Sequence, residues 1–476
     1  MQDLADNSRQ TICAIATAYG SAGIAVVRVS GADAIRIVDS LFRGKHPLSE
    51  AATHTARYGT IGGQSSPDNE QPILDTVVCT VFRAPHSFTG EDTVEISCHG
   101  SLFVQQELVR LLIDAGARMA DKGEFTKRAF LNGRIDLAQA EAVADLIAAS
   151  SAAEKDVALS QLRGGVSGKI AELREQLLTF TSLLELELDF ADHEELEFAD
   201  RSQLTALLNS AAQTISSLIA TFQAGNAIKQ GVQVAIVGAP NAGKSTLLNA
   251  LLGDERAIVS DIRGTTRDTI EDTIIIGGVL VRLTDTAGIQ STEDVIEQKG
   301  IERSRQAIRK AHIVIELLDS TDPQPVLSAD ELNPRQVLLR VLNKVDLQSS
   351  NPQIFKSSNL QILKSSNPQI LKSSNLIYIS AKLGDIQPLL SRLESEVANL
   401  TAHTDSVLIS NARHYEALCR AQTALERVSE GLQAALSGEL LALDLHDALD
   451  ALGEITGEVS SQEVLNTIFE RFCIGK

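Results

Sequence analysis

The stretch Val234-Ala-Ile-Val-Gly-Ala-Pro-Asn-Ala-Gly-Lys-Ser-Thr-Leu-Leu-Asn-Ala250 decides the fold of the central part of the chain. Its order of residue types predicts a strand, a glycine loop and a helix, which is the context of a phosphate-binding loop. Gly238 and Gly243 let backbone N–H groups close around phosphate oxygens, while the helix points its positive end at them. Lys244 supplies a cation and Ser245 a hydroxyl for magnesium. We therefore expect a phosphate-binding α/β domain.

Two downstream motifs extend this prediction to the metal and the terminal phosphate. Asp285-Thr286-Ala287-Gly288 follows a strand-like run, so that Asp285 can reach the magnesium shell and the Gly288 amide the terminal phosphate. Between the two motifs lies Thr265-Thr266, in a Gly-Thr-Thr stretch suited to a mobile switch that closes on the metal. The correct order of these motifs argues against a chance match of the glycine loop.

Two polar stretches select the base. Asn343-Lys344-Val345-Asp346 and Ser380-Ala381-Lys382 each follow an apolar, strand-like run. Asp346 can accept hydrogen bonds from both N1–H and the exocyclic amine of guanine, whereas adenine offers no such pair of donors. The predicted nucleotide is therefore GTP.

The predicted GTP-binding residues come from these motifs and from the segment that precedes Thr265. Lys244 is also expected to act in catalysis, as the cation on the phosphates. The full set is Asn241, Ala242, Gly243, Lys244, Ser245, Thr246, Ser260, Asp261, Ile262, Arg263, Gly264, Thr265, Thr266, Asp285, Thr286, Ala287, Gly288, Asn343, Lys344, Asp346, Ser380, Ala381 and Lys382.

Two departures from a Ras-like GTPase bear on hydrolysis. Ile289 stands where Ras-like proteins place the glutamine that orients the attacking water. Glu297 is a candidate general base or water-positioning group, although an acidic residue in a polar stretch is more often merely solvated. Asn241 can help to hold a monovalent cation with the carbonyls around Ser260 and Ile262, and potassium there can do the electrostatic work of an arginine finger.

Composition indicates a globular, cytosolic protein of two or three domains. The chain has 476 residues, of which 43% are hydrophobic and 22% charged. Its five cysteines form no C-x-x-C pair, so that neither a zinc site nor a disulfide framework is indicated. Residues 1–10 are polar and acidic, and no apolar run approaches the roughly 18 residues of a membrane span. We expect a protein that is neither exported nor membrane-spanning.

The net charge of −20 excludes a general electrostatic grip on nucleic acid. Contact with RNA must therefore use a local basic patch or a partner protein. One candidate patch consists of Lys122, Lys127, Arg128 and Arg134, although an ordinary helix surface is the commoner explanation for such spacing.

The order of patterns predicts α/β plus α architecture. A small α/β domain is expected over residues 1–121, and a phosphate-loop domain with a mixed sheet flanked by helices over 226–397. Residues 122–225 and 398–476 are helical in pattern, so that the simplest architecture inserts the nucleotide domain into one helical domain built from both flanks.

Individual elements are also predicted. Ser460 with Glu463 forms a plausible capping box at the start of the last helix. In the first domain, strands are expected at 12–17, 24–30, 76–82 and 93–98, with helices near 32–41 and 102–115; further helices are expected at 170–188, 414–436 and 438–455.

Six further motifs lie toward the two ends of the chain. They are Thr11-Ile-Cys-Ala-Ile-Ala-Thr17, Gly23-Ile-Ala-Val-Val-Arg-Val-Ser-Gly31, Phe88-Thr-Gly-Glu-Asp92, Gly123-Glu-Phe-Thr126, Gly453-Glu-Ile-Thr-Gly-Glu458 and Phe472-Cys-Ile-Gly-Lys476. Together they resemble the MnmE (TrmE) family of tRNA wobble-uridine modification GTPases. The resemblance covers nearly the whole chain, and the combination of motifs is more specific than any one of them.

The resemblance implies metal ligands and folate contacts. For potassium it implies Asn241, Ser260, Ile262 and Thr265; for magnesium, Ser245 and Thr266; for hydrolysis, Glu297; for a tetrahydrofolate one-carbon donor, Arg28, Glu95, Arg134 and Lys476. At Arg134 most members have lysine, and arginine keeps the charge but changes reach and geometry.

The resemblance also implies the reaction and the partners. A homodimer, paired through its amino-terminal domains, would act with the flavoprotein MnmG (GidA), which carries FAD and uses NADH, in a heterotetramer or larger complex. Together they would install an aminomethyl or carboxymethylaminomethyl group at C5 of the tRNA wobble uridine. Cys473 is a candidate catalytic thiol because Lys476 lies nearby and can favour the thiolate, although a lone cysteine is usually inert.

Two other classes of protein remain as alternatives. Cys473 is fourth from the end, as in a prenylated, membrane-attached switch, but Gly475 and Lys476 fit that signal poorly and no polybasic stretch precedes it. A ribosome-assembly or RNA-binding regulatory GTPase is the stronger alternative. The chain has no GXXG loop in a basic carboxy-terminal domain, and its acidity argues against a direct grip on RNA.

Overall fold

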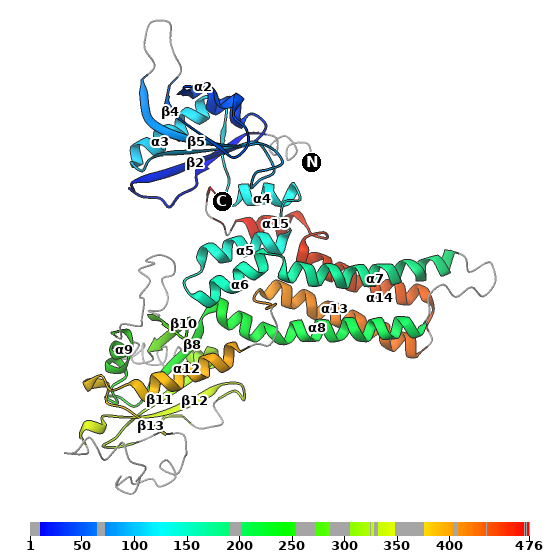
Figure 1. The fold of residues 1–476 in the computed structure, drawn as a ribbon. Helices are drawn as coiled ribbons and strands as arrows, with labels where there is room; N and C mark the ends of the chain where they lie inside the picture. The colour runs from blue at the N-terminus through cyan, green and yellow to red at the C-terminus, as the bar shows by residue number, and fades with distance from the viewer. Residues whose placement is uncertain are drawn as a thin grey trace, which may run out of the picture. The chain divides into compact units, whose positions relative to one another are not determined.

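The computed structural model describes residues 10–63, 72–189, 201–253, 272–285, 305–323, 325–327, 332–347, 376–402, 407–434, 436–470, 472 and 474–475 (Figure 1). The chain forms two compact units, which are described separately. The first comprises Met1–Ala144, Leu162–Glu175 and Leu449–Lys476, and the second Asp145–Gln161 and Gln176–Ala448.

The first unit contains a seven-stranded sheet in the order β3-β4-β5-β6-β2-β1-β7. Neighbouring strands are antiparallel, except that β1 and β7 run parallel. The strands are β1 Ile12–Ile15, β2 Ile24–Ser30, β3 Phe42–Gly44, β4 Thr55–Gly62, β5 Ile73–Phe82, β6 Thr93–His99 and β7 Arg118–Met119.

The two faces of this sheet differ in burial. One face packs its alternate side chains, among them Val27, Val77 and Ile96, against α2 Ala34–Leu41 and α3 Leu102–Asp114. The other face carries the cross-strand row of Val26, Ser97, Val78 and Tyr58, of which Val78 and Tyr58 are exposed, and Arg28 lies two residues beyond Val26 on β2. The period of two along each strand therefore separates a core face from a face with polar and exposed side chains.

Helical segments complete the first unit. Leu137 and Phe472 belong to a buried cluster with Ala140, Leu465 and Phe469. The last described residues return to the amino-terminal domain, where Ile474 forms an isolated antiparallel bridge with Lys122. The helices named here are α4 Glu124–Leu131, α5 Leu137–Ala148 and α15 Gln462–Phe469.

The second unit contains a six-stranded sheet in the order β13-β12-β11-β8-β10-β9. All neighbours are parallel, except that β9 runs antiparallel to β10. The strands are β8 Val232–Gly238, β9 Asp272–Ile276, β10 Val279–Asp285, β11 Ile313–Asp319, β12 Val337–Asn343 and β13 Leu376–Tyr378. Because the parallel strands are buried on both faces, they read as continuous apolar runs.

Helices lie before, between and after the strands of this sheet along the chain. They are α6 Ala152–Leu162, α7 Gly165–Asp189, α8 Arg201–Gln230, α9 Lys244–Leu252, α12 Gln387–Thr401, α13 Ala412–Gln433 and α14 Gly438–Thr456. α8 and α13 run alongside each other in Figure 1, and the rings of Phe222 and Tyr415 stack between them at 4.2 Å. The predicted fold class is confirmed, while the domain limits at 121, 225 and 397 stay predictions. None of the described helices is both long and apolar enough to cross a membrane.

Most predicted elements are confirmed, and the exceptions have physical causes. β3, β4, β7, β9 and β11 were not predicted; β4 carries Gly59 and Gly62, which weaken the strand signal. A Cβ added at Gly59 would clash with the ring of Phe42, so close approach of β3 requires glycine there. The predicted cap at Ser460 was wrong by one residue, because Ser461 Oγ accepts the Val464 N–H at 3.3 Å.

Candidate functional site

The phosphate loop joins β8 to α9, and two of its residues have positive φ: Asn241 at 64° and Gly243 at 97°. A Cβ added at Gly243 would clash with the amide nitrogen of Asn343, so glycine is required by conformation and by space. The first-turn N–H groups of α9 have no intrahelical acceptors, which makes this helix end suited to an anion.

Lys244 is the first residue of α9, and its ammonium returns to the loop. Nζ donates to the carbonyl oxygens of Gly238 at 2.8 Å and Ala239 at 2.9 Å. Burial lowers the pKa of Lys244 below its usual value, and the Asp285 carboxylate opposes that shift. The cation is therefore held at the loop by two neutral acceptors, where a phosphate would supply the counter-charge.

Ser245 and Asp285 form an oxygen pair beside this lysine. β10 runs parallel to β8, so Asp285 ends its strand opposite Ile236. Ser245 Oγ donates to Asp285 Oδ2 at 3.2 Å. A hydroxyl and a carboxylate are ligands that Mg²⁺ accepts, together with water and phosphate oxygens, so this pair fits a magnesium ion. Elsewhere in the described ranges, no group of three or more His, Cys, Asp or Glu side chains could hold a metal.

Asn343 connects the base-selecting motif to the phosphate loop. Its side chain is 2% exposed, donates through Nδ2 to the Ala242 carbonyl at 2.9 Å and accepts the Ala381 N–H at 3.0 Å. Ser380 Oγ donates to Asp346 Oδ1 at 2.6 Å. The structure thus brings together three motifs that lie far apart in the sequence, because their strands end at the same edge of the parallel sheet. Two further predicted nucleotide contacts, Thr246 next to Ser245 and Lys382 next to Ala381, are exposed.

Sequence reasoning missed a clamp on Lys344, which has a positive φ of 64°. Its Nζ pairs with Asp319 Oδ2 at 2.7 Å, and Ser320 Oγ donates to its carbonyl at 2.8 Å. Burial alone would raise the pKa of Asp319, but hydrogen bonds from Lys344 and Thr321 outweigh it, so the pKa lies below its usual value. The signal in the sequence was Asp319-Ser320, at the end of the apolar run that forms β11. In the sheet, Asp319 lies opposite Asn343 on β12.

Part of the predicted nucleotide site lies outside the described residues. This applies to Glu297 and to both stretches that flank the β9–β10 hairpin. The residues concerned are Ser260, Asp261, Ile262, Arg263, Gly264, Thr265, Thr266, Thr286, Ala287, Gly288 and Glu297. Their predicted contacts with phosphate, magnesium and potassium stay predictions.

A second candidate site lies in the amino-terminal domain around Arg28. Arg28 on β2 and Glu95 on β6 are directly paired across the two strands. Arg28 Nε and Nη2 contact the same carboxylate oxygen, Glu95 Oε1, at 3.0 and 2.8 Å. Oε2 makes no hydrogen bond within the described part of the chain, and the Glu95 side chain is 31% exposed. Glu95 Oε2 can therefore accept a hydrogen bond from a ligand while Oε1 stays paired with Arg28.

Two aromatic rings flank the Arg28 guanidinium. Its central carbon lies 5.7 Å from the ring centroid of Phe88 and 5.5 Å from that of Phe125. Gly90, two residues after Phe88, lies against the Arg134 side chain, whose Cγ would be 3.1 Å from a Cβ placed there. Of the four predicted folate contacts, Arg28 and Glu95 therefore form one site, and Arg134 lies beside the loop that carries Phe88.

The carboxy-terminal tail approaches the same domain, although Cys473 and Lys476 lie outside the described residues. Gly475 has a φ of 96° and packs so closely on the Ile15 carbonyl that a Cβ would clash with it. The other four cysteines are free thiols; burial raises the pKa of Cys13 to about 11, which argues against its use as a nucleophile.

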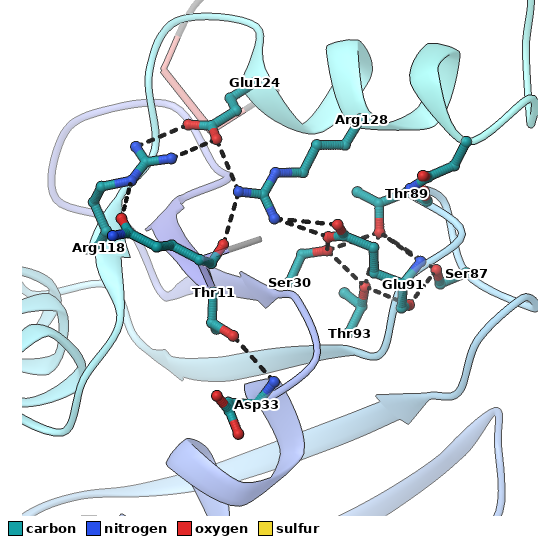
Figure 2. Close-up of polar contacts among 12 residues, drawn as sticks. Thr11, Ser30, Asp33, Ser87, Thr89, Glu91, Thr93, Arg118, Glu124 and Arg128 are labelled. Atoms are coloured by element: carbon teal, nitrogen blue, oxygen red, sulfur yellow. Dashed lines mark hydrogen bonds and ion pairs between the residues drawn. The ribbon is translucent and has the colours of Figure 1, made fainter. Parts of the chain in front are cut away.

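The prediction that Lys122, Lys127, Arg128 and Arg134 form one basic surface is wrong, because Arg128 is buried. Figure 2 shows Arg128 turned inward between Glu91 and Glu124, and its side chain is only 5% exposed. Lys127 Nζ donates to Asn466 Oδ1 at 3.1 Å. Spacing at three to four residues located the helix, but it could not reveal that buried carboxylates face Arg128.

Comparison with known proteins gives two family matches. Residues 11–134 match the family described as the GTP-binding protein TrmE N-terminus, and residues 137–473 match the MnmE helical domain. Proteins named tRNA modification GTPase MnmE align over 98% of this chain and 100% of their own lengths. They include those of Parabacteroides distasonis at 50% identity, Bacteroides fragilis at 48% and Flavobacterium johnsoniae at 47%.

Proposed function

The chain belongs to the MnmE (TrmE) family and is a tRNA modification GTPase, and from this premise we propose what each of its two candidate sites does. We propose that the nucleotide domain hydrolyses GTP with potassium and magnesium. We propose that the Arg28 site holds a tetrahydrofolate one-carbon donor.

The buried Asn343 side chain is the observation that carries the assignment of GTP to the first site. Through Ala242 and Ala381 it fixes the phosphate loop and the base-selecting loops to one another. In this frame Asp346 would accept the two guanine N–H donors, and Lys244 would move its hydrogen bonds from the loop carbonyls to phosphate oxygens. Ser245 and Asp285 would hold magnesium, which neutralises charge on the phosphates when bound.

The potassium proposal rests on the position of Asn241. Its backbone is left-handed, and its side chain is exposed in a loop that otherwise wraps the phosphates. An amide oxygen there suits a monovalent cation, with Ser260, Ile262 and Thr265 as further proposed ligands. Thr266 is a further proposed magnesium ligand, and Glu297 is proposed to position the attacking water.

Turnover of GTP in potassium and in sodium tests this proposal. We expect turnover to be about tenfold or more faster in potassium, because the cation would stabilise charge that develops on the phosphates. The variant Asn241→Ala should lose the preference for potassium. Equal rates in the two salts would contradict the role given to Asn241.

The folate proposal rests on the chemistry of the Arg28 site. A pterin ring has adjacent N–H donors that can bind Glu95 Oε2, and its flat face can pack against the ring of Phe88. Arg134 and Lys476 would add positive charge for the carboxylates of the folate tail. Equilibrium dialysis with a reduced folate tests the proposal, and undetectable binding at millimolar ligand would refute it.

The partners are proposed from the reaction. We propose that a homodimer works with MnmG (GidA), with its FAD and NADH, in a heterotetramer or larger complex on the wobble uridine of tRNA, in the cytoplasm. Exposed apolar side chains on the sheet face opposite the core support pairing through the amino-terminal domain, because Tyr58, Val78 and Ile24 are 73%, 38% and 67% exposed. A direct role for Cys473 in the transfer is proposed as well, and the variant Cys473→Ser tests it by tRNA modification.

The alternative of a regulatory GTPase that grips RNA by itself loses its main support. Its candidate basic patch is interrupted by Arg128, which pairs with two carboxylates in the interior. The net charge of −20 also opposes a general attraction to RNA.

A further inference from the structure

A cluster of four charged side chains lies inside the amino-terminal domain (Figure 2). Arg128 Nη1 contacts both carboxylate oxygens of Glu91 at 3.1 and 3.2 Å, and Nη2 contacts Glu124 at 2.9 Å and the Gln10 carbonyl at 2.8 Å. Arg118 binds Glu124 at 2.6 Å from the other side. The exposed fractions of the Arg128 and Glu124 side chains are only 5% and 11%. None of these residues belongs to the proposed folate contacts.

The cluster joins the loop between β5 and β6 to α4. Glu91 lies in the loop between β5 and β6, and its Oε2 accepts the Ser30 hydroxyl at 2.8 Å. Arg128 lies on α4, and at the end of the same helix Asn132 Nδ2 donates to the Thr89 carbonyl at 2.7 Å. The loop is therefore attached to α4 at two points.

The same two segments carry the rings that flank Arg28. Phe88 precedes Glu91 by three residues in the loop, and Phe125 precedes Arg128 by three residues on α4, about one helical turn. Each ring thus lies on the segment of one partner of the ion pair. A shift of α4 relative to the loop would move the two rings relative to each other and change their contacts with the Arg28 guanidinium.

Stability alone is a poor reason for such a pair. The desolvation of two charges offsets most of their attraction, so a buried ion pair contributes little net stability. What the guanidinium adds is geometry, because its planar fork reaches four acceptors on three segments at once. A lysine would keep the charge and lose the fork.

We propose that the Arg128–Glu91 ion pair is the positioning device of the folate site, holding Phe88 and Phe125 next to Arg28 without touching the ligand. This inference rests on the proposed folate function. It assigns a role to the loop Phe88-Thr-Gly-Glu-Asp92 and to α4 that is separate from ligand contact.

The test compares full-length variants Arg128→Lys and Glu91→Gln with matched changes at the surface. Arg110→Lys and Glu107→Gln are the controls, because Arg110 and Glu107 form an exposed ion pair on α3 of the same domain. The dissociation constant for 5-formyltetrahydrofolate is measured by equilibrium dialysis, with GTP turnover and thermal melting on the same preparations. Since the chain has no tryptophan, the near-ultraviolet dichroism of bound pterin reports its placement.

We expect Arg128→Lys to weaken folate binding about tenfold and to change the pterin dichroism, because one ammonium cannot reach Glu91, Glu124 and the Gln10 carbonyl at once as the two Nη atoms of Arg128 do. GTP turnover should stay within twofold of wild type, and both control variants should bind folate normally. In an Arg28→Lys background, Arg128→Lys should add no further loss, since its effect acts through the flanked guanidinium.

Three results would overturn the inference. The first is wild-type affinity in both Arg128→Lys and Glu91→Gln, where Glu91→Gln decides if Arg128→Lys does not fold. The second is an equal additional loss in the Arg28→Lys background, which a purely structural role predicts. The third is no folate binding by wild-type protein, which refutes the proposed folate function and this inference with it.

Discussion

In the nucleotide domain, the groups proposed to contact phosphate, magnesium and guanine follow directly on β8, β10 and β12, whereas the Arg28 site is assembled across an antiparallel sheet and a helix. Arg28 and Glu95 are 67 residues apart, and Arg128 and the Gln10 carbonyl 118. In a parallel sheet the carboxyl ends of the strands meet at one edge, so that each short motif carries its own position. In the Arg28 site a residue's position depends on register and on buried ion pairs.

This difference predicts that damage to one site leaves the other intact. The largest effect is expected for Lys244→Ala, which removes the cation at the phosphate loop. GTP turnover should fall by roughly 10³-fold, because a positioned charge on the phosphates is lost. Steady-state release of phosphate measures this, and Lys155→Ala, a change at an exposed lysine on α6, serves as the control. An unchanged affinity for folate would show that the two sites are independent of each other, whereas a parallel loss of folate binding would contradict this.

Asn343→Ala tests whether one buried amide holds the nucleotide motifs together. Two hydrogen bonds would be lost and the Ala242 carbonyl and Ala381 N–H left without their partner, at about 1 to 3 kcal/mol per group. We expect guanine-nucleotide affinity to fall about 100-fold, as measured with a fluorescent GDP analogue. The exposed Asn249 on α9 provides the control Asn249→Ala, which should bind normally. A loss of less than threefold would show that each motif holds its position alone.

Glu95→Gln tests the second site in the same way. The amide keeps one oxygen but loses the charge that pairs with Arg28 and would accept pterin N–H groups, so folate affinity should fall about 20-fold. Calorimetric titration with a reduced folate measures the change, and GTP turnover should not move. Normal folate binding by this variant would remove Glu95 from the site.

The smallest effect is expected for Asp319→Asn, which weakens the clamp on Lys344. The pair is partly exposed, so we expect only about a fivefold loss of nucleotide affinity, with unchanged turnover at saturating GTP. Glu394→Gln, which removes an exposed carboxylate on α12, is the matched control. If turnover at saturation fell instead, Asp319 would act in the chemical step and not in binding.

Local sequence patterns accounted for much of the fold. The strands at Ile24 and Thr93 and the phosphate loop were predicted because apolar runs, glycines and polar ends occur together over short distances. β4 escaped prediction because its glycines serve close packing on β3, which depends on a neighbour brought in by folding. The cap at Ser461 differed by one residue, since helix ends depend on single hydrogen bonds.

The sequence by itself determined the nucleotide chemistry, because phosphate, metal and guanine each need particular residue types at fixed spacing directly after a strand. It also carried the resemblance that led to Arg28 and Glu95. Only the tertiary structure decided that Arg128 is a buried partner of Glu91 and not part of a basic surface, and that Asp319 holds Lys344. Charge and spacing along a chain do not specify which side chains meet across it, because burial and pairing are set by the packing of distant segments.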